Sequence, residues 1–396
     1  MTWIDLGVGL CGLPPLGASM YLAALAILSR RPSIPPATAP HLKFVIVVPA
    51  HDEEGGIART VESLKAIDYP PEFFHVLVVA DNCHDRTAER AAAAGADVLV
   101  RCEPRQRGKG YALARAFDDI LAEDFADAIV VVDADTLVSR NLLKAFASRF
   151  ETGAVAVQAE YGVQNALSSW RTRLMTIALA AFHDVRSLGR ERLGLSCGLR
   201  GNGMGFSREV LRAKPYGAFS IVEDLEYGLE LGFAGFRVTY IGEARVLGEM
   251  VTTERASRSQ RRRWEHGRTV LTRQYLPRLL KEAWRRRDGC LLDLALDLLV
   301  PPLAQLAAVT AVGSALALAT LWTLGRADVA LSIWGATSLG LCAYVVRGWF
   351  LSGVGARGLL DLLRAPGYVL WKLALLFARK DAKPDEWIRT GREVKM

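Results

Sequence analysis

The sequence IVVVDAD occupies residues 129–135. Its four apolar residues predict a strand that is buried on both faces, as in a parallel sheet covered by helices. Asp133 and Asp135 follow at the carboxyl end of that strand, where open α/β sheets bind their ligands. Residues two apart on extended backbone point the same way, so the pair could bind one Mg²⁺ or Mn²⁺ together with phosphate oxygens. For the pair taken alone, an ordinary polar turn is the competing interpretation.

Short apolar runs alternate with helical segments on both sides of this strand. The predicted strands are Phe44–Val48, Val76–Val79, Val98–Val100, Ile129–Val132 and Ala154–Ala159. The predicted helices are Ile57–Ala66, Arg86–Ala94 and Tyr111–Leu121. This alternation predicts an α/β fold with a parallel, doubly wound sheet. Because polar residues 51–53, 81–82 and 133–135 follow three of the strands, we expect a nucleotide-type crevice at that edge.

The composition indicates a membrane protein. The chain has 396 residues, of which 51% are hydrophobic, and a formal net charge of +7. Its basic residues cluster beside apolar spans, which favours cytoplasmic flanks of membrane segments. No nucleic-acid partner is expected, because no recognition module accompanies the charge. The six cysteines are scattered without a C-x-x-C pair, so neither a zinc site nor a disulfide framework is indicated.

Three apolar stretches are long enough to cross a bilayer. The first covers residues 6–28, and Arg30-Arg31 follows it, which favours an anchor over a cleaved signal peptide. The other two are about 302–324 and 329–351, whereas residues 356–377 alternate basic and apolar residues and suggest an interfacial helix. The expected domains are an N-terminal transmembrane helix (1–30), a linker (31–41), a cytoplasmic catalytic domain (42–270), an interfacial helix (271–290), two transmembrane helices (291–352), and an interfacial helix with a basic cytoplasmic tail (353–396). A multi-pass protein of the inner, or plasma, membrane is therefore predicted.

Three later segments add candidate functional residues. Gly198 to Phe206 is dense in glycine, which lets backbone approach a ligand closely, although a plain loop is an equal alternative. Glu223-Asp224 opens a predicted helix, where acidic residues are ordinary caps. The basic segment 255–268 holds Trp264 and could equally be a cationic helix on a membrane surface.

These features together suit a metal-bound diphosphate. Lys109 and the arginines could neutralise its charge, a cation could stabilise it as a leaving group, and a further carboxylate could serve as general base for an attacking hydroxyl. The chain lacks G-x-x-x-x-G-K-[ST], and no G-x-G-x-x-G follows the first strand, which argues against a phosphate-loop ATPase and a dinucleotide enzyme.

From Phe44 to Arg268 the sequence resembles the membrane-bound family 2 glycosyltransferases, which include cellulose, chitin and hyaluronan synthases and ceramide glucosyltransferases. Five motifs occur in the family's order. They are the opening segment with Pro49, His51 and Glu53, the first aspartate Asp81, the D-x-D pair Asp133 and Asp135, Glu223-Asp224, and Gln260-x-x-Arg263-Trp264. The Lys109 segment and Gly201-Asn202-Gly203 are similar to two further segments of the family. His51 stands where the family usually has tyrosine.

The resemblance implies an A-type glycosyltransferase fold, Rossmann-like with a mostly parallel sheet, and an inverting single displacement. It implies that Pro49, His51, Glu53, Asp81, Lys109, Asp133 and Arg263 bind a nucleotide sugar, expected to be a UDP-sugar. Asp135 with Asp133 would hold Mg²⁺ or Mn²⁺, and Asp224 would be the catalytic base. Gly201, Asn202, Gly203, Glu223, Gln260 and Trp264 would line the acceptor site.

The expected acceptor is a growing cell-surface or extracellular polysaccharide, and the alternative is one transfer to a membrane lipid. Three spans are fewer than processive synthases usually carry, so export would need several copies or a partner. A decayed transferase domain in a scaffold or sugar-binding protein is a remote alternative, since the acidic motif residues are all present. A nucleotidyltransferase would also use a carboxylate-bound metal, but it explains neither Q-x-x-R-W nor the spans.

Overall fold

The computed structural model describes residues 2–36, 39–250, 254–364 and 367, with the backbone alone for residues 254–263. Its described residues form two compact units. The α/β unit takes in residues 31–165 and 194–295. The helical unit takes in the described residues of 1–30, 166–193 and 296–382. Residues 166–193 thus pack with the terminal helices, although the sequence predicted one continuous domain from residue 42 to 270.

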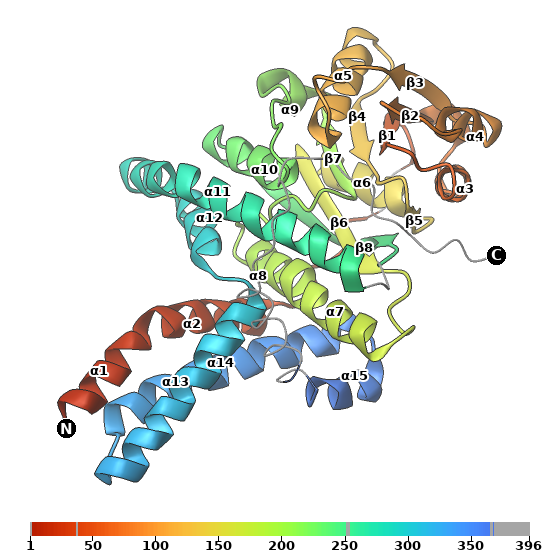
Figure 1. Ribbon diagram of the computed structural model, residues 1–396. Coiled ribbons are helices and arrows are strands. Elements are labelled where there is room, and N and C mark those ends of the chain that lie inside the picture. Colours follow the sequence, from red (N-terminus) through yellow and green to blue (C-terminus); the bar gives the residue numbers. More distant parts are fainter. Residues whose placement is uncertain (1, 37–38, 251–253, 365–366, 368–396) are drawn as a thin grey trace. The chain divides into compact units, whose positions relative to one another are not determined.

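The α/β unit holds eight strands and the helices that connect them (Figure 1). The strands are β1 Phe44–Ala50, β2 Phe74–Asp81, β3 Asp97–Arg101, β4 Ala128–Val131, β5 Thr136–Val138, β6 Ala156–Val163, β7 Met204–Ser207 and β8 Val238–Gly248. The helices are α3 Ile57–Lys65, η1 Pro71–Phe73, α4 Thr87–Ala93, α5 Lys109–Ala122, α6 Leu142–Glu151, α9 Arg208–Ala213, α10 Glu223–Phe233 and α11 Glu254–Arg286, followed by α12 Gly289–Leu299.

One mixed sheet contains all eight strands, in the order β3-β2-β1-β4-β7-β6-β8-β5. Strands β3, β2, β1 and β4 are parallel, and in their register Ala50 lies opposite Ala80 while Val47 lies opposite Val131. The carboxyl ends of β2, β1 and β4 therefore meet at one edge of the sheet, as the sequence predicted. Strand β7 runs antiparallel to both β4 and β6, and β5 runs antiparallel to β8.

The core of the unit explains why β1 is apolar at every position. Phe44, Ile46 and Val48 join Ile57 and Val61 of α3 in one buried cluster on one face. The alternate residues of β1 are buried too, on the face that α5 contacts. Both faces of this strand are covered. A polar residue at any position of β1 would therefore replace buried apolar surface and reduce the hydrophobic stabilisation of the fold.

Two predicted elements differ from the observed ones. The glycine-dense segment, in which no strand was predicted, contains β7, and the glycine at position 205 packs against Phe146 and Val157. The possible cationic helix 255–268 and the predicted interfacial helix 271–290 belong largely to one continuous helix, α11, despite Pro277. The other predicted strands and helices of this unit are confirmed within a few residues of their ends.

The helical unit consists of α1 Trp3–Cys11, α2 Leu13–Leu28, α7 Trp170–Ala180, a π-helical turn Ala181–Val185 (η2), α8 Arg186–Arg192, α13 Leu303–Leu324, α14 Asp328–Ser352 and α15 Gly355–Leu362. Its first and last long helices are joined by a buried cap. Asp5 is 1% exposed, and its Oδ1 accepts a 2.9 Å hydrogen bond from the backbone N–H of Ala330 in the first turn of α14. The indole of Trp334 donates to the Val8 carbonyl at 3.0 Å and packs closely against Gly313, where a Cβ would lie 2.3 Å from the ring.

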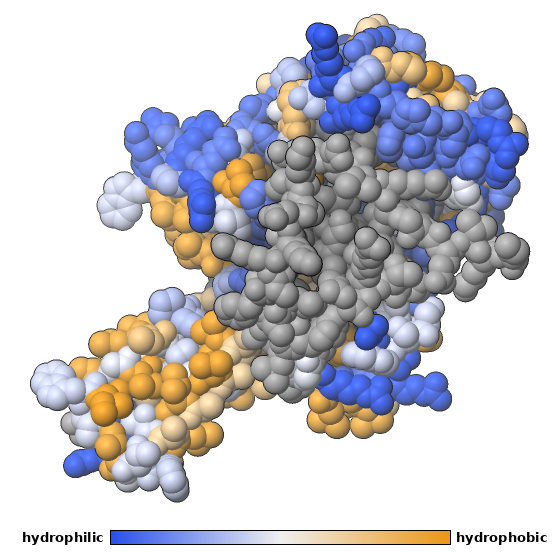
Figure 2. All heavy atoms as spheres, viewed as in Figure 1, coloured by the Kyte–Doolittle hydropathy of each residue, from blue (hydrophilic) through white to orange (hydrophobic). Residues whose placement is uncertain are grey.

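Helices α13 and α14 are long and apolar enough to cross a bilayer. Helices α1 and α2, bent by 45° at their junction, make a third candidate if they act as one span. In the lower left of Figure 2, where Figure 1 draws α1 and α13, apolar residues predominate and strongly hydrophilic ones are sparse. Large side chains such as Trp322 and Leu339 are 87% and 73% exposed, which suits contact with lipid rather than water. The expected interfacial helix 356–377 begins as α15, and most of the remainder lies outside the described residues.

Candidate functional site

The predicted acidic residues lie at the carboxyl edge of the parallel strands. Asp81 is the last residue of β2, and Asp133 and Asp135 lie between β4 and β5. Because β1 separates β2 from β4 and pairs with both in parallel, all three acids belong to the same edge of the sheet. This agrees with the expectation from the polar strand ends.

Lys109 connects that edge to the glycine-dense segment. It is the first residue of α5, and its Nζ donates to Asp133 Oδ1 at 2.5 Å and to the Gly201 carbonyl at 2.6 Å. Its Nζ also lies 3.6 Å from Glu223 Oε1. Burial alone would lower the pKa of Lys109, but the charges of Asp133 and Glu223 outweigh it and raise the pKa above its ordinary value. The lysine therefore stays charged and holds two carboxylates from distant segments.

Glu223 and Asp224 open helix α10 and face the same lysine. Gly201 lies against them: a Cβ added there would be 3.3 Å from Asp224 Oδ2 and 3.6 Å from Lys109 Nζ. Burial, with a smaller contribution from the neighbouring Asp224, raises the pKa of Glu223 to about 7 against the attraction of Lys109. Burial also raises the pKa of Asp224. A carboxylate held partly desolvated in this way is a better proton acceptor than a solvated one.

The side chain of Asn202 hydrogen-bonds to the segment that contains Asp133 and Asp135. Its Oδ1 accepts from the Asp133 backbone N–H at 3.1 Å, and its Nδ2 donates to Thr136 Oγ1 at 2.8 Å. Its carbonyl accepts from Gln158 Nε2 at 2.7 Å. At Gly203 the backbone has φ +69°, and a Cβ would come within 2.7 Å of Val246. These contacts give both residues a structural role, and their contact with an acceptor stays a prediction.

The opening segment joins β1 to the end of β2. Pro49 pairs with Val79 within the sheet, and the His51 imidazole Nδ1 donates to the Asp81 carbonyl at 2.8 Å. The Glu53 backbone N–H donates to Thr87 Oγ1 at 2.8 Å, and its carbonyl accepts from the N–H groups of Gly56 and Ile57 at the start of α3. The segment therefore lies beside Asp81, where a nucleotide base was predicted to bind.

Trp264 lies on α11 and is 45% exposed. One turn further along the helix, Gly267 packs so closely on Ile221 that a Cβ there would be 2.5 Å from its Cγ2. Since Ile221 precedes Glu223 by two residues, α11 contacts the loop that leads into the acid pair. The side chains of Gln260 and Arg263 lie outside the described residues.

Sequence reasoning missed two residues of this edge. Arg101, the last residue of β3, donates from Nη1 to Asp81 Oδ1 at 2.6 Å. Tyr161 of β6 lies near Asp133 and Asp135, the predicted metal ligands. Burial raises the pKa of Tyr161, and the negative charges of these two residues raise it as well. Arg101 directly follows a predicted strand, so its sequence position could have indicated that it lies at the ligand edge. Tyr161 lies within β6, and its sequence position gave no such indication.

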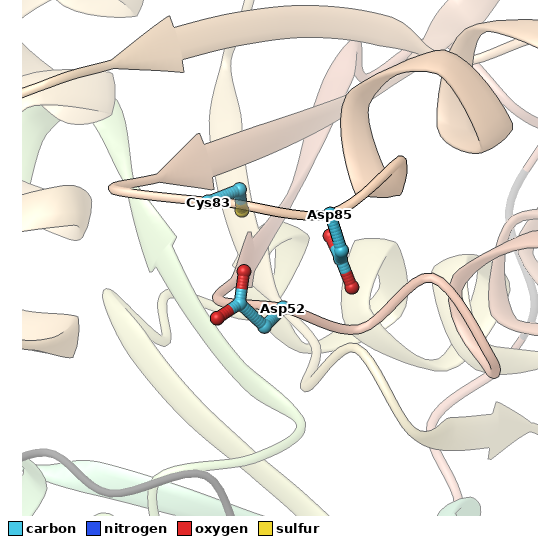
Figure 3. A group of neighbouring side chains, drawn as sticks. All are labelled: Asp52, Cys83 and Asp85. Carbon is cyan, nitrogen blue, oxygen red and sulfur yellow. The ribbon is translucent and has the colours of Figure 1, made fainter.

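Another acidic group lies on the same side of the sheet. Asp52, Cys83 and Asp85 bring one potential ligand atom each within 4.8 Å of one another (Figure 3). The two carboxylates already accept hydrogen bonds from backbone amides of the neighbouring loops. Asp52 accepts from the His84 N–H at 2.7 Å, and Asp85 accepts from the Glu54 N–H at 3.0 Å. Burial raises the pKa of the Cys83 thiol, which disfavours the thiolate that a metal needs. We therefore assign this group a structural role.

Comparison with known proteins places this geometry in context. A family model described as "Glycosyltransferase like family 2" matches residues 40–267. Beta-monoglucosyldiacylglycerol synthase of Synechocystis sp. is 29% identical over 269 residues, which cover 64% of this chain and 54% of that protein. The probable glycosyltransferase YdaM of Bacillus subtilis is 24% identical over 248 residues, which cover 60% of this chain and 58% of that protein. The chain thus spans little more than half the length of these two relatives.

A solved structure shares the fold. The mannosyltransferase PcManGT from Pyrobaculum calidifontis, in complex with GDP-Man and Mn²⁺, matches with a TM-score of 0.56 at 16% identity, covering 90% of this chain and 98% of that one. The likeness bears on the fold alone at this identity, and it agrees with the predicted A-type glycosyltransferase fold.

Proposed function

The chain belongs to glycosyltransferase family 2, and on that premise we propose that it is a hexosyltransferase using a UDP-sugar as donor. The observation that carries the proposal is the convergence of Asp133, Glu223 and Asp224 around Lys109 at the carboxyl edge of the sheet. Three carboxylates and one lysine there suit a site for a diphosphate, a cation and an attacking hydroxyl.

In the proposed reaction Asp224 is the general base. The acceptor hydroxyl attacks the anomeric carbon of the sugar from the face opposite the nucleotide. Its oxygen bonds to that carbon while the bond to the diphosphate oxygen breaks, so the configuration inverts and the nucleoside diphosphate leaves. Asp224 takes the hydroxyl proton. Its raised pKa supports this role, because a base is most effective when its pKa approaches the working pH.

Asp135 and Asp133 fit a divalent cation shared with a diphosphate. Mg²⁺ and Mn²⁺ are commonly bound by one or two carboxylates together with phosphate oxygens and water, rather than by a closed protein cage. When bound, the cation would offset the negative charge on the leaving diphosphate. Lys109, already paired with Asp133, would release that carboxylate in part and contact the diphosphate in its place.

A membrane lipid is the acceptor we favour. The relative with 29% identity is a monoglucosyldiacylglycerol synthase, and the described helices include only two spans with a bent third candidate. Trp264 would stack on the acceptor beside the loop leading to Asp224. A growing polysaccharide is the second candidate, since a probable glucomannan 4-beta-mannosyltransferase of Arabidopsis thaliana is 24% identical over 241 residues. That product would need a pore from further copies or an export partner.

We place the protein in the inner membrane with its α/β unit in the cytoplasm. Arg30-Arg31 after the first apolar segment and the basic C-terminal residues support this orientation through the positive-inside rule. Cytoplasmic nucleotide sugars would then reach the site directly.

Two measurements test the proposal. Detergent-solubilised full-length protein, supplied with Mn²⁺ or Mg²⁺ and a panel of UDP-sugars, should release UDP from one of them when lipid extract is added. Mass spectrometry of the product should then show one sugar on a lipid; a ladder of sugars would instead support the polysaccharide. Failure to release nucleotide from any sugar donor, with either lipid or glycan acceptors, would overturn the enzymatic proposal.

A further inference from the structure

The two carboxylate oxygens of Asp81 have unequal surroundings. Its side chain is fully buried, and Oδ1 accepts from Arg101 Nη1 at 2.6 Å and from Asn82 Nδ2 at 3.0 Å. Oδ2 is buried as well, and it accepts no hydrogen bond from any residue in the described part of the chain. A carboxylate oxygen has about two good acceptor positions, so Oδ1 is saturated, whereas Oδ2 keeps its acceptor capacity unused among the described residues.

Both donors to Oδ1 are fixed by further bonds. Arg101 Nη1 and Nη2 also donate to the carbonyl and Oε1 of Gln106, at 2.8 and 3.2 Å, and the guanidinium lies 6.0 Å from the Tyr111 ring. The Asn82 Oδ1 accepts from the Glu103 N–H at 2.9 Å, which orients its amide towards Asp81. Oδ1 therefore stays occupied unless this network is broken.

Nucleobases differ in what they offer to one free acceptor. Uracil and thymine present a single imide N–H between two carbonyls. Guanine presents two adjacent donors, its N1–H and its amino group, which together need both oxygens of a carboxylate. Adenine and cytosine present an unprotonated ring nitrogen, which a carboxylate oxygen repels. A buried donor left without a partner weakens binding strongly.

We propose that Arg101 and Asn82 determine base specificity by saturating Oδ1 of Asp81, so that the site takes an imide base, uracil or thymine, and rejects guanine. The inference rests on the proposed donor-binding role of Asp81 and assigns that role two further residues. Arg101 and Asn82 act through Asp81, as positioning residues that do not contact the base.

Isothermal titration of the full-length protein in detergent with Mn²⁺ measures this directly, using UDP and GDP as ligands. The wild type should bind UDP at least about tenfold more tightly than GDP, the effect of one unsatisfied buried donor. Arg101→Met removes the donors at nearly constant length, and Asn82→Gly removes the amide while tolerating the φ of +49° at that position. Both substitutions should bring the ratio of the GDP and UDP dissociation constants closer to one, because Oδ1 becomes free to accept from the second guanine donor.

Controls separate selection from folding. Arg115→Met breaks an exposed 2.9 Å pair with Asp119 on α5 and should leave the ratio unchanged. Arg101→Lys should restore part of the preference by supplying one donor. If Arg101→Met does not fold, Asn82→Gly decides the outcome.

The possible results have distinct meanings. Equal binding of UDP and GDP by the wild type would overturn this inference and leave the proposed transfer intact. An unchanged ratio in folded Arg101→Met and Asn82→Gly would overturn it as well, since the two residues would then be structural. Binding of neither nucleotide by the wild type would overturn both the inference and the proposed function.

Discussion

Lys109 Nζ lies 2.5 Å from Asp133 Oδ1, a contact between the first turn of α5 and the loop after β4. The same nitrogen lies within 3.6 Å of Glu223, so one cation compensates carboxylates from two distant segments. The contact makes Lys109 important for stability as well as for the proposed donor binding.

Lys109→Met should therefore weaken the protein in two ways. Lys109 and Asp133 are only half-buried, and removing the charged donor of such a pair typically costs about 1–3 kcal/mol of unfolding free energy. UDP affinity should fall at the same time. Thermal melting and titration with UDP measure the two effects. Lys144→Met breaks an exposed 2.6 Å pair with Asp68 and is the matched control, expected to change stability by less than about 1 kcal/mol. Equal melting temperatures for the two variants would contradict the prediction.

Asp224→Asn should abolish transfer while leaving UDP binding near normal. Loss of a general base typically lowers kcat by about 10²–10⁴-fold. The change keeps the size of the side chain, so the fold should be retained. Release of UDP in the presence of acceptor measures the rate, and calorimetry measures the affinity. A variant that no longer bound UDP would show that Asp224 belongs to the donor site instead.

Asp135→Asn should abolish the metal dependence of UDP binding. An amide is a weaker ligand for Mg²⁺ or Mn²⁺ than a carboxylate, and Asp133 would remain paired with Lys109. Titrations with UDP, with and without Mn²⁺, provide the measurement. Asp119→Asn, on the exposed face of α5, should behave as the wild type. An undiminished effect of Mn²⁺ in Asp135→Asn would remove this residue from the metal site.

Glu223 should make the ligand-free protein less stable as pH rises. Burial raises the pKa of Glu223 from 4.5 to about 7 in the fold. A carboxyl group whose folded pKa is raised favours the fold fully below the unfolded pKa, and that contribution is lost as pH rises from 4.5 through 7. Melting temperatures between pH 4.5 and 8 should show the loss, and Glu223→Gln should reduce it. A slope that is the same in both proteins would show that other groups cause it.

The rate of transfer should respond to pH in the opposite direction. The pKa of Asp224 is raised by burial, and the proposed base acts only when ionised. The rate should therefore fall on the acid side with an apparent pKa above the ordinary aspartate value of 3.8. A pH profile of kcat measures it. A rate that is flat down to that ordinary value would contradict the role of Asp224.

Gly110→Ala should disturb the loop that leads into Glu223. A Cβ at Gly110 would lie 2.2 Å from the Ala218 carbonyl oxygen, a backbone atom that cannot move without shifting the loop. Overpacking of this kind costs about 1–3 kcal/mol, and kcat should fall because the acid pair follows that loop. Gly217→Ala, where nothing lies within 4 Å, is the control. Wild-type melting and rate in Gly110→Ala would refute the coupling.

The sequence predicted the parallel half of the sheet because periodicity reports burial directly. The run before Asp133 is apolar on both faces, and it became a buried strand with the acids at its end. The antiparallel pairings of β7 were not predicted, because β7 is formed by a glycine-rich segment whose pairing with β4 and β6 depends on contacts distant in sequence. Glycine gives little local signal for a strand.

The candidate site was predicted unevenly for a similar reason. The family resemblance identified these residues, and the structure brings Lys109, Asp133, Glu223 and Asp224 together as neighbours. Arg101 was overlooked because its role depends on which carboxylate oxygen it contacts, and a sequence holds no such information. The structural role of Asn202 inside the fold likewise required the positions of Thr136 and Gln158.

The cap between Asp5 and the amide of Ala330 has a consequence for biosynthesis. The two residues are 325 positions apart in the chain, and the carboxylate is buried when the contact is made. A ribosome must therefore complete almost the whole polypeptide before the first helix finds its partner. Until then Asp5 cannot make its contact with α14. A truncation that removes residues 1–12 would also remove the carboxylate that binds the free amides at the start of α14.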